Sequence, residues 1–271
     1  MKNIGFQGYA LLLVVFFMSF FGCKNAKNDH KMRLLSFDTL YTYNNIDVYT
    51  HPDAPQMKVT VEYIFPNNDE EILNTFNEKM FGAKGVVGNA GTALNNYVAF
   101  LESYYRNNAD STEAVHLPED LLAKTFHLCN EIAYQDTMFV SGRIDKILYE
   151  GGIHPSNEIT LFTIDRHTGK TLNERDLFVN GYQESLSKLL VTALQEKYRK
   201  ENPEDLEPEG FFNTEEISSN GNFMLDDKGI LYCFNEYEIA TYALGAIFIR
   251  IDYATLSPIL SPDSPAHFYF R

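Results

Sequence analysis

The sequence contains no tryptophan and only three cysteines among its 271 residues. The large core positions must therefore be filled by its 21 phenylalanines and 17 tyrosines. Neither the HExxH nor the CxxC spacing of common zinc sites occurs, so we predict no metal and no cofactor. Cationic residues are also few: 37 Asp and Glu outnumber 22 Lys and Arg, which gives a net charge of −15. A surface with that charge repels nucleic acid and favours basic proteins as partners.

One long apolar run is present, and it lies at the N-terminus. It extends from about Tyr9 to Phe21, after one early cation, and is followed by Gly22 and Cys23. A charged start, an apolar segment short of a ~20-residue span and a small residue are typical of a signal peptide. The Gly22-Cys23 pair resembles a bacterial lipobox, with Phe20 in place of the usual leucine. We therefore predict that residues 1–22 are removed and that Cys23 is lipidated; the alternative is an uncleaved membrane anchor.

Lipidation would make the chain an exported protein that is anchored to the bacterial cell envelope, at the outer membrane or the periplasmic face. Removal of residues 1–22 takes away one cation, Lys2, and changes the net charge from −15 to −16. The polar residues 23–35 suit a tether. Cys129 and Cys233 then remain, and both follow apolar, strand-like sequence. They can form a disulfide in an oxidising compartment, or they can be two buried free thiols.

Hydrophobic periodicity predicts an α+β fold with antiparallel sheets and helices packed on them. In the first half, residues 57–66 alternate as a half-buried strand. A helix then starts with Asn68 and Glu71 in capping-box positions, places Ile72, Leu73, Phe76 and Met80 on one face, and stops at Gly82. A second helical stripe follows at 92–106, and residues 126–150 indicate two strands connected near 135–137.

The second half shows stronger patterns. Hairpins are predicted at 158–172, with the turn at His167 to Gly169, and at 223–234. Between them, a helix is expected from a cap at Asn180 to a stop at Pro203. Alternation at 245–253 predicts a last strand. We expect two modules, at residues 36–150 and 151–271.

The stretch YEGGIHPSNEITLFTIDRHTGKTLNERDLF places two histidines near several carboxylates, at residues 149–178. A metal or acid/base site could use His154, His167, Glu158, Asp165 and Asp176, but their spacing matches no zinc motif. The simpler interpretation is a turn and framework formed by Gly151, Gly152, His154, Pro155 and Asp176. In the segment NEYEIATYALG, Tyr237, Glu238 and Tyr242 could line a binding groove or pack in the core.

Four segments of the second half follow one another along the chain: YEGGIHP, FTIDRHTGKTLNERDLF, DDKGILYCFNEYEIATYALG and IRIDYATLSPIL. This order resembles the extracellular RsiV/PdaC-type family, whose C-terminal module occurs in a lysozyme-sensing anti-sigma factor and beside the catalytic domain of some peptidoglycan deacetylases. The resemblance covers about residues 149–262, and a weaker one covers 37–150 as a PdaC-like module. The sequence departs from the family at Ile153, where alanine is usual, and at Thr241, where proline is usual.

The resemblance implies an RsiV-like binding module without an active site of its own. Only about eighteen residues follow Tyr253 and about eight precede the apolar run, so neither a deacetylase domain nor a sigma-factor-binding segment is expected. We therefore predict a non-catalytic envelope lipoprotein that binds a basic lysozyme-like protein or a peptidoglycan fragment. The alternative is a cell-envelope hydrolase that uses His154 and nearby carboxylates.

Overall fold

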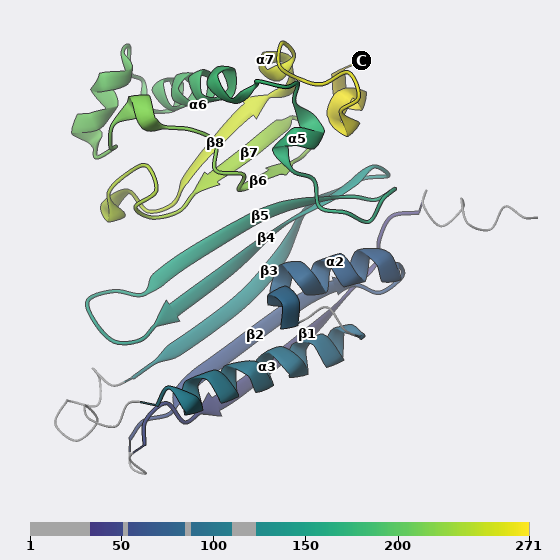
Figure 1. The fold of residues 1–271 in the computed structure, drawn as a ribbon, viewed down its shortest axis with the longest axis vertical. Coiled ribbons are helices and arrows are strands. Elements are labelled where there is room, and N and C mark those ends of the chain that lie inside the picture. Colours follow the sequence, from purple (N-terminus) through teal and green to yellow (C-terminus); the bar gives the residue numbers. More distant parts are fainter. Residues whose placement is uncertain (1–32, 51–53, 85–87, 110–122, 271) are drawn as a thin grey trace, which may run out of the picture.

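The computed structural model describes residues 33–50, 54–84, 88–109 and 123–270. They form an α+β fold with one five-stranded and one three-stranded sheet, each covered by helices (Figure 1). This arrangement confirms the predicted fold class. Within these ranges, no helix combines the length and the apolar character needed to cross a membrane. Cys23 and the predicted signal peptide lie outside the described residues.

The larger sheet has the spatial order β1-β2-β3-β4-β5. Its strands are β1 (Phe37–Ile46), β2 (Met57–Pro66), β3 (Thr125–Gln135), β4 (Phe139–Tyr149) and β5 (Ser156–Asp165). All neighbours pair antiparallel except β2 and β3, which are parallel. The parallel pair of β2 and β3 differs from the antiparallel sheet that the sequence predicted. The chain between these two strands forms helices, and parallel pairing requires such a crossover.

Two helices cover one face of this sheet, α2 (Glu70–Phe81) and α3 (Ala90–Asn107), which are separated by the short helix η1 (Gly82–Lys84) (Figure 1). The predicted stripe of α2 is buried at Ile72, Phe76 and Met80. The capping residue differs from the prediction. Asp69 accepts a hydrogen bond from the Ile72 amide at 3.1 Å, whereas the Asn68 side chain accepts one from the Ser36 amide at 3.1 Å.

The smaller sheet has the order β6-β7-β8, formed by β6 (Phe223–Leu225), β7 (Gly229–Phe234) and β8 (Ile247–Asp252). The long helix α6 (Gln183–Tyr198) lies on it and buries Leu186, Leu190 and Leu194 completely (Figure 1). The predicted cap at Asn180 is wrong, because α6 begins after Tyr182 and has no side-chain cap. The remaining helices are short: α5 (Glu174–Leu177), η2 (Pro203–Glu209), η3 (Thr214–Glu216), η4 (Tyr242–Leu244), α7 (Tyr253–Leu256) and η5 (Pro265–Phe270).

The two sheets meet at their edge strands, β5 and β6, and side chains join them. The amides of Asn222 and Asn235 both bond the main chain of Ile159 on β5, at 2.7–3.1 Å. In the opposite direction, Ser141 and Thr163 bond the main chain of β6. A boundary between residues 150 and 151 therefore falls between β4 and β5, two paired strands of one sheet.

Candidate functional site

The turn between β4 and β5 presents a histidine to solvent. Gly151 has φ 96° and Gly152 φ 110°, a backbone region that L side chains rarely adopt, so glycine suits both positions. The Tyr149 hydroxyl donates to the Gly152 carbonyl at 3.1 Å and fixes the turn. His154 is exposed, and its Nδ1 lies 3.1 Å from the carbonyl oxygen of Pro155, to which it donates in the matching tautomer.

A second segment brings two tyrosines to that histidine. The rings of His154 and Tyr242 are stacked, with centroids 3.8 Å apart and an interplanar angle of 19°. Tyr237 lies beside Tyr242, with centroids 5.8 Å apart. Its φ of 66° is unusual for a tyrosine, and its side chain is 59% exposed. We call His154, Tyr237 and Tyr242 the aromatic surface.

Carboxylates flank the aromatic surface, and asparagines hold the segment in place. Glu236 accepts a hydrogen bond from the Asn157 side chain on β5 at 2.9 Å. Glu238 accepts one from Asn220 at 2.6 Å, and Asn235 accepts from the Ile159 amide at 2.7 Å. These bonds tie the loop after β7 to the edge of β5, so the tyrosines stay beside the glycine turn.

The surroundings of Tyr242 favour its neutral, hydroxyl-bearing form. Desolvation, the Glu236 carboxylate and Tyr237 together raise the pKa of Tyr242 above its ordinary value. Tyr242 therefore stays a neutral phenol at neutral pH, able to stack and to donate. A cavity of about 260 Å³ lies beside Asn157 and Glu236. It is otherwise lined by two ion pairs, Arg143 with Asp145 and Lys146 with Glu158, and by Ile147, Ile159 and Ala246.

The structure thus brings together seven of the residues singled out in the sequence: Gly151, Gly152, His154, Pro155, Tyr237, Glu238 and Tyr242. Asp176 lies elsewhere and is part of the N-terminal capping box of α5, where its Oδ2 accepts a hydrogen bond from the Asn173 amide at 2.8 Å. Glu236 and Asn157 were missed. The signal for Glu236 was its position beside Tyr237, whereas nothing in the sequence pairs Asn157 with it.

The other candidate ligands take framework roles. Asp165 accepts from the His167 amide at 2.7 Å and shapes the turn, and Glu158 forms an ion pair with Lys146. Among the residues that the structure describes, no group of three or more His, Cys, Asp or Glu side chains is placed to hold a metal ion.

The two described cysteines are free thiols, so the disulfide considered for Cys129 and Cys233 is not formed. Cys129 lies on β3 and Cys233 on β7, in different sheets, because the chain pairs their strands with other partners. Burial, and then the Glu238 carboxylate, raise the pKa of Cys233 to about 12. Burial, followed by Asp145, also raises the pKa of Cys129.

We expect both thiols to resist alkylation in the folded chain. A raised pKa leaves little thiolate, which is the nucleophilic form, so iodoacetamide at pH 7.5 should label each residue at least roughly tenfold more slowly than in the urea-unfolded chain. Peptide mapping by mass spectrometry reads Cys129 and Cys233 separately. Equal rates in the folded and unfolded chains at either residue would contradict this expectation.

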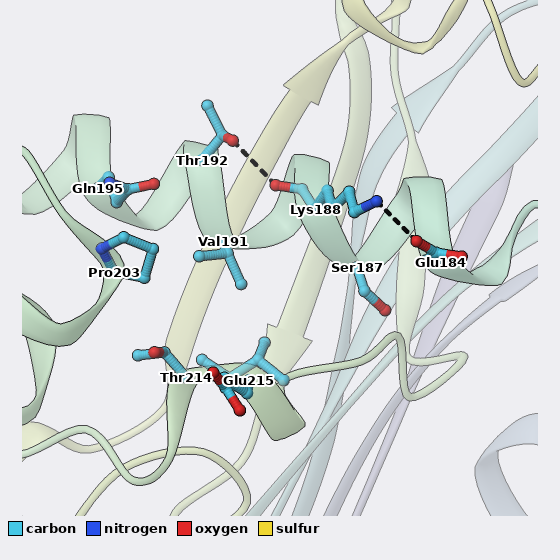
Figure 2. A pocket seen from close by; sticks show the side chains of 10 residues that line it. Glu184, Ser187, Lys188, Val191, Thr192, Gln195, Pro203, Thr214 and Glu215 are labelled. Atoms are coloured by element: carbon cyan, nitrogen blue, oxygen red, sulfur yellow. Dashed lines mark hydrogen bonds and ion pairs between the residues drawn. The ribbon is translucent and has the colours of Figure 1, made fainter.

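A separate groove of about 350 Å³ runs between α6 and the segment 203–217 (Figure 2). Some of its polar side chains already have partners. Lys188 pairs with Glu184 at 2.6 Å, and Thr192 donates to the Lys188 carbonyl at 2.9 Å (Figure 2).

Comparisons with known proteins agree with this architecture. No curated protein was found to match the sequence. Solved structures of similar fold include a member of the DUF3298 family from Bacteroides fragilis, with a TM-score of 0.73 and 22% identity over 86% of this chain and 96% of that one. A DUF3298 family protein from Pseudomonas aeruginosa has a TM-score of 0.62 and 14% identity over 86% and 97% of the two chains. Residues 175–254, which include the tyrosines of the aromatic surface, match the family model described as "Protein of unknown function (DUF3298)".

Proposed function

We propose that this chain is a non-catalytic lipoprotein of the bacterial cell envelope that binds a basic, lysozyme-like protein through the aromatic surface. The observation that carries the proposal is the stack of exposed His154 on half-buried Tyr242, with exposed Tyr237 beside it and carboxylates at its border. Tyrosines are enriched at the centres of protein interfaces, and a carboxylate border attracts a basic partner. The resemblance to RsiV/PdaC-type proteins suggests the lysozyme-like class.

A peptidoglycan fragment is the other ligand considered, since sugar rings also stack on aromatic side chains. The net charge of −15 favours the basic protein over an anionic glycan. The hydrolase alternative finds less support. The partners of His154 are an aromatic ring and a backbone carbonyl, whereas a general base needs an orienting group and a reacting group within hydrogen-bond reach.

The test is titration calorimetry of the full chain, in detergent, with lysozyme and with an unrelated protein of similar size and positive charge. We expect binding to lysozyme alone, weakened by salt as the Debye length falls from ~10 Å at 0.1 M to ~3 Å at 1 M. Tyr242→Ala should weaken binding at least ~30-fold, because it removes a central aromatic anchor and the support of His154. Tyr41→Ala is the matched control, since Tyr41 is 64% exposed on β1.

The possible outcomes separate the ligands. Equal binding of the two basic proteins, or of neither, would remove the support for a lysozyme-like partner. Binding of a soluble peptidoglycan fragment that Tyr242→Ala abolishes, without binding of lysozyme, would assign the surface to the glycan. Unchanged affinity in Tyr242→Ala would move the binding site away from the aromatic surface.

The envelope anchor is tested separately. Cys23→Ser should abolish labelling of the protein by a radioactive fatty acid and release it from the membrane fraction, because the acylated thiol is then missing. The matched control is Cys129→Ser, which should leave both readouts unchanged. Continued acyl labelling of Cys23→Ser would refute lipidation at this residue.

A further inference from the structure

A third cavity, of about 460 Å³, lies where α2, β5 and α5 approach one another. Its volume is within the range of small-molecule sites. Buried apolar side chains line part of it, namely Leu161, Phe162, Leu172 and Phe223. Lys79 of α2 and Arg175 of α5 line the same cavity. An apolar wall with two cations in the lining is the composition expected for a site that takes an organic anion.

The charge of this cavity is opposite to that of the chain. Two cations and one carboxylate, Glu174, line it. The groove beside α6 is lined by two carboxylates and one lysine, and the cavity beside Asn157 and Glu236 by three carboxylates and two cations. Of these three cavities, only the one at α5 has a positive lining, although the chain carries −15.

Three of the described lysines form ion pairs, and Lys79 is among the others, which do not. Lys146, Lys188 and Lys200 form ion pairs with neighbouring carboxylates. Among the described residues, the Lys79 ammonium has no ion-pair partner within 4 Å, and it is half-buried. Burial lowers its pKa, because the ammonium is partly removed from water, and the neighbouring Glu78 carboxylate offsets this effect only in part. Its place in the last turn of α2 is favourable for a cation, yet the helix end does not require the side chain to line a cavity.

Glu174 sets the charge that the ligand can carry. Its oxygens accept hydrogen bonds from the hydroxyls of Tyr182 at 2.9 Å, Ser219 at 3.0 Å and Tyr232 at 3.0 Å. These three hydroxyls hold the Glu174 side chain in place where it lines the cavity. One negative charge near two cations accommodates a monoanion better than a dianion such as phosphate.

We infer that this cavity binds a small monocarboxylate with an apolar body, whose carboxylate pairs with Lys79 and Arg175 and whose body packs on Phe162 and Phe223. The inference does not depend on the aromatic surface, which lies on other segments of the chain.

Thermal-shift and calorimetric titrations of the full chain with hexanoate and benzoate test this site. Both acids should bind, whereas acetate, benzamide and phosphate should bind at least ~10-fold more weakly. Acetate lacks the apolar body, benzamide lacks the negative charge, and phosphate lacks the apolar body and carries more than one charge. Comparison with N-acetyl-leucine separates a peptide carboxyl terminus from a free acid as the natural source. The absence of binding by hexanoate, benzoate and N-acetyl-leucine at roughly 10 mM would overturn the inference.

Variants locate the site. Lys79→Met and Arg175→Met should each weaken benzoate binding at least ~10-fold, which corresponds to about 1.4 kcal/mol. Lys79→Arg keeps the positive charge and should retain binding. This variant shows whether the effect of Lys79→Met comes from the lost charge or from disturbed folding. Lys188→Met changes an exposed lysine in another groove and should have no effect. Benzoate binding that survives Lys79→Met unchanged would also overturn the inference.

Discussion

Replacing Glu174 with alanine should lower the free energy of unfolding by about 3 kcal/mol, because buried hydroxyl groups beside the smaller sheet lose their shared acceptor. Tyr232 is fully buried and Tyr182 is 7% exposed, and both donate to Glu174. An unsatisfied buried donor costs about 1–3 kcal/mol. Tyr182 also lines the cavity at α5, where water can replace the lost acceptor, so we expect most of the loss to come from Tyr232. Urea unfolding followed by circular dichroism measures the change.

Two comparisons isolate the cause. Glu184→Ala removes an exposed glutamate on α6 and should leave the unfolding midpoint unchanged. Tyr232→Phe deletes the donor itself, so the double variant Glu174→Ala/Tyr232→Phe should be less destabilised than the sum of the single variants. Strict additivity in this cycle would show that the phenol-carboxylate bond is not the source of the loss.

The sequence predicted most elements because their signals are local. Alternation predicted β2 and β8, where Ile247, Ile249 and Ile251 are all buried, and the stripe of leucines predicted α6. Helix starts were predicted less well. Asn68 and Asn180 have the chemistry of caps, but Asp69 caps α2 and no side chain caps α6. Several polar residues close together could each serve, and tertiary contacts decide among them.

Relations between distant segments could not be predicted from local pattern. The parallel pairing of β2 with β3 depends on the path of the helices between them. For the candidate site, the resemblance indicated both the glycine turn and the tyrosine segment, but not the stacking of His154 on Tyr242. That contact spans almost ninety positions of sequence and exists because Asn157 and Asn235 join the strand edges. Local sequence also did not predict that Lys79 and Arg175 line one cavity, since nothing in either segment points to the other.

The double variant Ser141→Ala/Thr163→Val should destabilise the chain by about 4 kcal/mol, because it removes the hydroxyls that satisfy the edge of β6. Both side chains are fully buried, and their oxygens lie 2.8 Å apart. Ser141 donates to the Leu225 carbonyl at 2.7 Å, and Thr163 accepts from the Leu225 amide at 2.8 Å. Alanine and valine keep nearly the same volume, so the packing is preserved while two buried main-chain groups lose their partners. Calorimetric melting and urea unfolding measure the loss.

A matched pair of substitutions on α6 separates this effect from the chemistry of the replacements. Ser187→Ala/Thr192→Val changes the same residue types where Thr192 is exposed, and should shift the unfolding free energy by less than about 0.5 kcal/mol. The two sheets have separate hydrophobic cores, one under α6 and one under α2 and α3. At the junction, a small apolar cluster of Ile159, Leu161 and Cys233 supplements the polar bonds, and Phe139 of β4 belongs to the core under α6. We therefore expect the junction variant to broaden or divide the unfolding transition, since the cores can then unfold at different urea concentrations. A sharp single transition with an unchanged midpoint would mean that these hydroxyls do not hold the two sheets together.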